Sequence, residues 1–292
     1  METLTILSRL WDPNHDKVVC SDLSGNINTA HRSSVLKWLF ESLDLLRIEG
    51  RVFFTTVMLA DRYCAVGAPR RKLEGSELQL IILSALCCSL KVEESSLDLS
   101  VKAFIEHVSG GHVEAKDIFA TESKILQALD FNTFTPSLSV YLESFYFVLM
   151  NPVKSVGPLE QDAGISTLPS WASKQYYLSL YLLYLVVFEV DLLHSRKPCE
   201  VVSACILASA VTCFDDRRDI DKFVDALFQA GWISATCDIS ELVSEISKLW
   251  MRATNEKSEI VQSIVHLFDT KEKHFVSRLY LKHSSSVHVS GG

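Results

Sequence analysis

Apolar residues recur at helical spacing through most of this sequence, and the segments between them hold most of its few glycines and prolines. In the first half this pattern predicts helices at 31–48, 51–66, 75–91, 97–108 and 114–130. In the second half it predicts helices at 137–150, 169–192, 198–213, 218–230 and 238–254, with a long loop over about 151–170. The pattern therefore predicts an all-α protein with two sets of five helices.

The third helix of each set is apolar on nearly every face. The two segments read "SELQLIILSALCCSLK" (76–91) and "PCEVVSACILASAVTC" (198–213). A helix that is apolar all round has to be surrounded by other helices. We therefore expect each half to be a bundle around its own third helix, with the joint near Pro136, because a proline cannot continue the preceding helix.

Composition and charge narrow the class of protein. The chain of 292 residues is 48% hydrophobic and 22% charged, which is enough for a large core. Its formal net charge is −8 and it has no basic block, so we expect neither nucleic acid nor an anionic membrane as a partner. The longest apolar stretch, 176–188, is too short to span a bilayer and is followed by Glu189 and Asp191.

The cysteines show no ligand spacing. None of the eight forms a C-x-x-C or C-x-x-H pair, and most lie inside apolar helical patterns; they are Cys20, Cys64, Cys87, Cys88, Cys199, Cys205, Cys213 and Cys237. We expect reduced, buried thiols in an intracellular protein, with no metal and no cofactor. The sequence also lacks a nucleophile elbow, an H-E-x-x-H pair and a phosphate-binding glycine loop, so we do not expect an enzyme.

Two charged residues fall on predicted apolar stripes. Arg32 lies in register with Leu36, Leu39 and Leu43 on the first helix, and Asp61 lies on the inward stripe of the second. Each charge alone would be costly to bury, whereas a guanidinium facing a carboxylate is tolerable. We therefore predict an ion pair between Arg32 and Asp61; the alternative is that both side chains reach solvent separately.

Two further charges have open interpretations. Glu122 lies on the apolar stripe of the fifth helix, and either takes a partner from outside that helix or lies solvated at the edge of the stripe. Lys91 ends the third helix, where the helix dipole alone favours a cation. From the residues alone, the dipole is the simpler explanation of Lys91.

Taken together, these segments resemble the cyclin box. "HRSSVLKWLFE" (31–41) is similar to the family's first-helix motif, and "ADRYC" (60–64) to its Asp-Arg-Phe/Tyr. "LQL" (78–80) with "SLKVEE" (89–94), and "ESKILQALDF" (122–131) with "TPS" (135–137), resemble its third and fifth helices and the joint. "SRKPCEVVSACILAS" continues the likeness, and "SIVHLFDTKEKHFVS" (263–277) resembles the tail of A- and B-type, or mitotic, cyclins.

The resemblance implies tandem five-helix cyclin folds with flanking N- and C-terminal helices. Its expected bounds are an N-terminal segment at 1–28, an N-terminal cyclin box at 29–134, a C-terminal cyclin fold at 135–256, and a C-terminal helix and tail at 257–292.

The resemblance also implies a function. It predicts a non-catalytic subunit that binds and activates a cyclin-dependent serine/threonine kinase in cell-cycle control, in the nucleus and cytoplasm. Lys91 and Glu122 match the two polar residues that clamp backbone groups of the kinase. The full set of implied kinase-binding residues is Lys91, Val92, Glu94, Glu122, Ile125 and Leu126. The alternatives are a cyclin of a transcriptional kinase and a scaffold that binds without activating.

Some mitotic cyclins also dock Arg-x-Leu peptides of substrates or inhibitors in a hydrophobic cleft. The positions of that cleft here are Val35, Trp38, Glu41, Leu78 and Gln79, and Val35 stands where the motif has a leucine. Elsewhere this sequence departs from the motif: His31 stands for its methionine, Ser34 for its isoleucine, and Gly75 for an arginine. We therefore expect such docking to be weak or altered.

Overall fold

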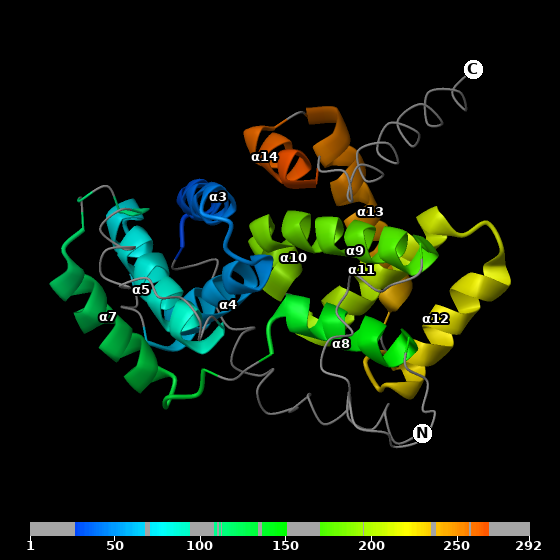
Figure 1. Ribbon diagram of the computed structural model, residues 1–292, viewed down its shortest axis with the longest axis horizontal. Helices are drawn as coiled ribbons and strands as arrows, with labels where there is room; N and C mark the ends of the chain where they lie inside the picture. Colours follow the sequence, from blue (N-terminus) through cyan, green and yellow to red (C-terminus); the bar gives the residue numbers. More distant parts are fainter. Residues whose placement is uncertain are drawn as a thin grey trace. The chain divides into compact units, whose positions relative to one another are not determined.

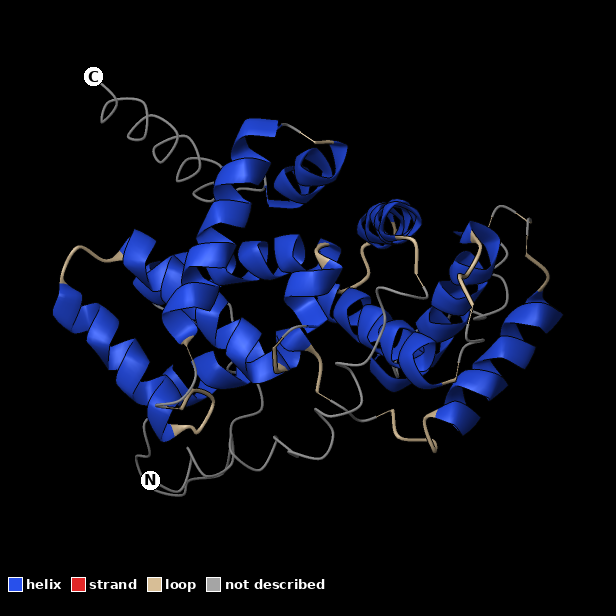
Figure 2. Ribbon diagram, turned by 180° about the vertical axis from the view of Figure 1, so that it is seen from behind, coloured by secondary structure: helices blue, strands red, loops and turns tan. Residues whose placement is uncertain are grey.

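The structure is a computed structural model that describes residues 27–67, 71–93, 108–109, 111, 113–133, 136–150, 170–194, 196–234, 238–256 and 258–268. Every regular element within these residues is a helix (Figure 2). The all-α prediction is confirmed. The predicted helix at 97–108 and the predicted loop near 151–170 lie almost wholly outside the described residues, as does the tail beyond Phe268.

Contacts divide the chain into two compact units. The first unit comprises Pro13–Ser137 with Val190–Ser195, and the second comprises Leu138–Glu189 and Arg196–Gly292 with Met1–Asp12. The first unit holds α3 (Thr29–Leu45), α4 (Gly50–Val66), α5 (Gly75–Glu93), α7 (Ala115–Ala128) and α10 (Val190–His194). The second holds α8 (Leu138–Met150), α9 (Ser170–Phe188), α11 (Pro198–Cys213), α12 (Arg217–Gln229), α13 (Ile239–Glu256) and α14 (Glu259–Phe268).

Each unit has the central helix that its sequence predicts. In the first unit α5 packs against α3, α4 and α7 (Figure 1), and all ten residues from Ile81 to Leu90 are buried. In the second unit α11 packs against α8, α9, α12 and α13, and its residues from Val201 to Ala210 are buried in the same way. Within the described residues, α5 is also the one helix long and apolar enough to cross a membrane by length and composition. Its contacts with three neighbouring helices account for that apolarity.

Local signals set several helix ends. The Asn28 side chain accepts hydrogen bonds from the backbone N–H groups of Ala30 (3.0 Å) and His31 (3.3 Å), which caps α3. The same helix ends at Leu45, before the predicted position 48, because Arg47 adopts a left-handed φ of 55°. Beyond the end of α7, Asp130 and Phe131 also adopt left-handed φ angles, of 50° and 56°.

The prediction of one helix at 169–192 is wrong, because the structure divides that segment into α9 and α10 at Glu189. The Glu189 N–H donates to the carbonyl of Val186, three residues earlier, at 2.9 Å. In an α-helix the acceptor lies four residues earlier, so the last turn of α9 is tighter than α-helical. The apolar pattern continues through the break because Val190 is also buried. Its segment, however, belongs by its contacts to the first unit.

Candidate functional site

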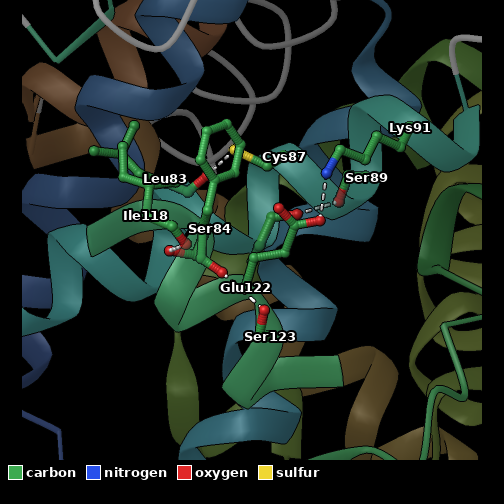
Figure 3. Close-up of polar contacts among 10 residues, drawn as sticks. Leu83, Ser84, Cys87, Ser89, Lys91, Ile118, Glu122 and Ser123 are labelled. Carbon is green, nitrogen blue, oxygen red and sulfur yellow. Dashed lines mark hydrogen bonds and ion pairs between the residues drawn. The ribbon is translucent and has the colours of Figure 1, made fainter. Parts of the chain in front are cut away.

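The end of α5 and the middle of α7 are joined by an ion pair between Lys91 and Glu122. The Lys91 Nζ atom lies 2.6 Å from Oε1 of Glu122, and the two side chains point toward each other (Figure 3). The Lys91 side chain is 48% exposed and the Glu122 side chain 9%. Glu122 therefore has the partner from outside its own helix that one interpretation of the sequence requires.

This ion pair contributes little to folding. A partly exposed pair is worth about 0–1 kcal/mol, because water screens the charges and two long side chains lose freedom. The Lys91 ammonium has three N–H donors, and a single carboxylate oxygen does not use all of them. About half of the Lys91 side chain also faces solvent. The Lys91 ammonium can thus donate a hydrogen bond to a partner's carbonyl while it stays paired with Glu122.

Apolar side chains border the pair. Phe119 is 38% exposed, and its ring centroid lies 5.7 Å from the Lys91 ammonium, within cation–π range. Val92, next to Lys91, is 39% exposed. Leu126 lies one turn beyond Glu122 and is partly exposed. Aromatic residues are enriched at protein-binding surfaces, so an exposed phenylalanine beside the ion pair favours such a surface.

Phe131, just beyond the end of α7, is an exposed aromatic residue that the sequence pattern misses. It is 65% exposed, and its backbone N–H donates to the Leu126 carbonyl at 2.7 Å, so the chain folds back against the end of α7. A left-handed φ and an exposed ring on the same residue are both unusual. The only sequence signal was an aromatic residue after the predicted helix end. We call Lys91, Val92, Phe119, Glu122 and Leu126 the α5–α7 face.

One predicted kinase-binding residue does not reach the surface of this face, and another lies outside the described residues. Ile125 is completely buried, because it points from α7 into the core, so it can support the face from beneath but offers no surface to a partner. We therefore leave Ile125 out of the face. Glu94 lies outside the described residues and stays a prediction.

Glu93 has a role that the sequence does not reveal. Its Oε1 accepts a hydrogen bond of 2.9 Å from the Thr55 hydroxyl, and its Oε2 lies 3.8 Å from Nη1 of Arg51. Both partners belong to α4. Lys91 thus ties the end of α5 to α7, and Glu93 ties it to α4. The charged stretch that closes α5 fixes the helix end between two neighbours.

Buried contacts hold α7 in place. The Ser84 hydroxyl of α5 lies 3.1 Å from the Ile118 carbonyl of α7, one turn before Glu122 (Figure 3). At the other end, the Arg62 guanidinium of α4 donates to the Asn132 carbonyl at 3.0 Å. Gly67 allows the close approach there, since a Cβ on it would lie 2.5 Å from the Ala128 Cβ.

The structure also brings together Arg32 and Asp61. The guanidinium donates from Nε to Oδ1 at 3.1 Å and from Nη2 to Oδ2 at 2.6 Å, with both residues buried. Burial by itself raises the pKa of Asp61, but the Arg32 charge and the hydrogen bonds from His194 and Arg32 outweigh it. The pKa of Asp61 therefore falls well below its ordinary value. The His194 contact was not predicted.

The predicted peptide cleft falls between α3 and α5, which pack together. Val35, Trp38 and Gln79 are partly exposed, while Leu78 is buried. The Glu41 carboxylate is exposed, and it lies 3.3 Å from the Lys37 ammonium on its own helix. The rim carboxylate thus already has a cation beside it.

Most of the described cysteine thiols are buried, and Cys213 is half-buried. None of the described ones forms a disulfide, and burial is the largest cause that raises the pKa of Cys87 and Cys88 to about 12. Within the described part of the chain, no group of three or more His, Cys, Asp and Glu side chains is placed to hold a metal ion.

Comparison with known proteins identifies the class. Residues 6–134 match the family described as "Cyclin, N-terminal domain". Over 120 residues the chain is 28% identical to G2/mitotic-specific cyclin-2 of Medicago sativa, covering 41% of this chain and 35% of that protein. It is also 28% identical over 120 residues to G2/mitotic-specific cyclin-1 of Medicago sativa subsp. varia, covering 41% of this chain and 27% of that one. The alignments thus span about a third or less of these relatives.

The fold leads to the same class. A viral cyclin from herpesvirus saimiri superposes with a TM-score of 0.56 at 13% identity, covering 84% of this chain and 97% of that one. The described chain therefore has the cyclin fold. Residues 6–134 match the N-terminal domain of cyclins, and the chain has a sequence likeness to mitotic cyclins.

Proposed function

We propose that this protein binds a cyclin-dependent serine/threonine kinase through the α5–α7 face and activates it in cell-cycle control. The observation that carries the proposal is the pairing of Lys91 with Glu122, 2.6 Å apart, on a face with exposed apolar side chains. The match to the N-terminal domain of cyclins and the mitotic relatives support the same class of partner.

The geometry of the face fits the task of holding another protein. Lys91 offers N–H donors and Glu122 offers carboxylate oxygens, so the pair can bind a backbone carbonyl and a backbone N–H of the partner. Val92, Phe119 and Leu126 offer apolar area beside them. The partner's apolar helix would pack on these side chains while its polar backbone ends meet the ion pair.

Activation then needs position and no chemistry from this chain. In an active protein kinase, a lysine on a strand forms an ion pair with a glutamate of the regulatory helix. A protein that presses that helix inward completes the pair. The α5–α7 face is suited to this because the Ser84 contact fixes α7 to α5 and the Arg62 contact fixes the end of α7 to α4. The Glu93 contact fixes the end of α5 to α4.

Docking of Arg-x-Leu peptides is a weaker part of the proposal. The cleft positions on α3 and α5 are present, but Leu78 is buried and the Glu41 carboxylate lies beside Lys37. A peptide arginine would have to displace that lysine. We therefore propose that Arg-x-Leu peptides dock weakly. We also propose that the protein acts in the nucleus and cytoplasm, with neither nucleic acid nor a membrane as a partner.

The first experiment mixes the purified chain with a panel of monomeric cyclin-dependent kinases and measures both binding and histone phosphorylation. Binding with increased phosphorylation supports the proposal. Binding without activation supports the alternative of a scaffold, and activation of a transcriptional kinase alone supports the other alternative. Absence of binding to every kinase in the panel contradicts the proposal.

A further inference from the structure

Asp61 is a shared acceptor for donors from two distant parts of the chain. Besides its two hydrogen bonds from Arg32, its Oδ2 atom lies 3.0 Å from Nε2 of His194, 133 positions later in the sequence. The side chains of Arg32, Asp61 and His194 are only 1%, 6% and 12% exposed. The cluster is therefore almost closed to water.

His194 belongs to a short helix in an unusual position. The five residues of α10 follow α9 with only Glu189 between them, yet by contacts they belong to the first unit. Val190, at the start of α10, is also buried. The segment is thus attached at both ends, by an apolar side chain and by a hydrogen bond to a buried carboxylate.

The direction of this hydrogen bond follows from the acceptor. The pKa of Asp61 is lowered below its ordinary value despite its burial, mainly by the Arg32 charge, so Oδ2 can only accept. The Nε2 atom of His194 must then carry the proton, which both the imidazolium and one neutral tautomer allow. A helix as short as α10 cannot hold itself by its own hydrogen bonds, because forming the first helical turn is unfavourable.

We propose that His194 is a latch that fastens α10 to the buried Arg32–Asp61 pair of the first unit. The latch holds the segment that follows the second unit's α9, and its release frees α10 while the Arg32–Asp61 pair stays intact. His194 acts here through Asp61 and is a positioning residue. This device does not depend on the proposed binding of a kinase.

The test uses a probe thiol in the full-length chain. Val190→Cys places a thiol at a buried position of α10, and its rate of alkylation, followed by peptide mass spectrometry, reports how often α10 detaches. This parent is then combined with His194→Ala, His194→Gln and Asp191→Asn. Glutamine keeps an N–H donor near the Nε2 position, and Asp191 is an exposed residue of the same helix.

The latch predicts about tenfold faster alkylation at position 190 with His194→Ala, the size of effect of losing one hydrogen bond to a charged group. His194→Gln and Asp191→Asn should label at the parent's rate. The buried Cys205 thiol of the second unit should stay unlabelled throughout, which separates local release from unfolding.

Two results would overturn the latch. In the first, His194→Ala labels no faster than the parent. In the second, His194→Gln labels as fast as His194→Ala, so that ring packing and not the donor holds α10. If Val190→Cys does not fold, a second measurement replaces the alkylation rate. NMR of the native chain then gives the rate at which the His194 Nε2–H proton exchanges with water. Slow exchange supports the latch, and exchange as fast as that of the exposed His266 contradicts it.

Discussion

The Lys91 ammonium of α5 lies 2.6 Å from the carboxylate of Glu122 on α7, thirty-one positions further along the chain. One partner is half exposed and the other nearly buried. Such a pair is worth little to stability, but it presents a fixed donor and acceptor on a face with apolar side chains. The proposal that the α5–α7 face binds the kinase depends on this combination.

The buried carboxylate of Asp61 makes stability depend on pH. Because its pKa is lower in the folded chain than the ordinary value of 3.8, it stabilises the fold above about pH 4, and this contribution is lost as the pH falls toward the folded-state pKa. Asp61→Asn removes the negative charge that faces the buried Arg32 guanidinium, which should cost about 3–5 kcal/mol.

Urea unfolding between pH 7 and pH 3 checks this prediction. The wild type should lose stability steeply below about pH 4, whereas Asp61→Asn should start lower and decline less. The exposed Asp191→Asn serves as the control and should follow the wild type. Parallel curves for the wild type and Asp61→Asn would show that the carboxylate has no special role.

Thr55 should support the α5–α7 face from behind. Thr55→Val keeps the shape of the side chain but removes the hydrogen bond to Glu93, leaving a partly buried carboxylate without that donor. We expect a loss of about 1–3 kcal/mol in the free energy of unfolding. Thr55→Ser keeps the hydroxyl and is the matched control. Equal stability of the two variants in thermal unfolding would refute the role of this bond.

The thiols of α5 should be inert in the folded chain. Burial raises the pKa of Cys87 and Cys88 to about 12, so almost no thiolate is present at pH 8 and reagents have no access. Iodoacetamide labelling with mass spectrometry should find both unmodified until denaturant is added. Modification of either at the rate of the denatured chain would mean that α5 is not a central helix.

The sequence predicts the helices well because burial and helical spacing are local properties. Both central helices could be predicted because nearly all their faces are apolar. The contact of Arg32 with Asp61 could be predicted because each charge lies on an apolar stripe. The break at Glu189 could not be found, since the apolar pattern runs on through Val190 while its neighbours change.

The site shows the same limit. That Glu122 has a partner from outside its helix is one of the two interpretations that the pattern leaves open. Helical spacing says nothing of which distant side chain arrives, so the contacts of Glu93 with Thr55 and of His194 with Asp61 needed the structure. The exposure of Phe131 depends on a left-handed backbone that no local signal marks.

The affinity of the chain for the kinase that it binds in the panel tests the central claim most directly, with Lys91→Ala and Glu122→Gln measured beside the wild type. Polar anchors at the centre of an interface cost about 2 kcal/mol or more when removed, so each variant should bind at least roughly thirtyfold more weakly. Glu122→Gln should keep its thermal stability, because it leaves only the half-exposed Lys91 without its partner. Lys91→Ala leaves the nearly buried Glu122 carboxylate without its cation and should lose about 1–3 kcal/mol in the free energy of unfolding. Lys124→Ala, an exposed lysine on the same helix as Glu122, should bind like the wild type. Wild-type affinity in both Lys91→Ala and Glu122→Gln would contradict the account, because the α5–α7 face would then not be where the kinase binds.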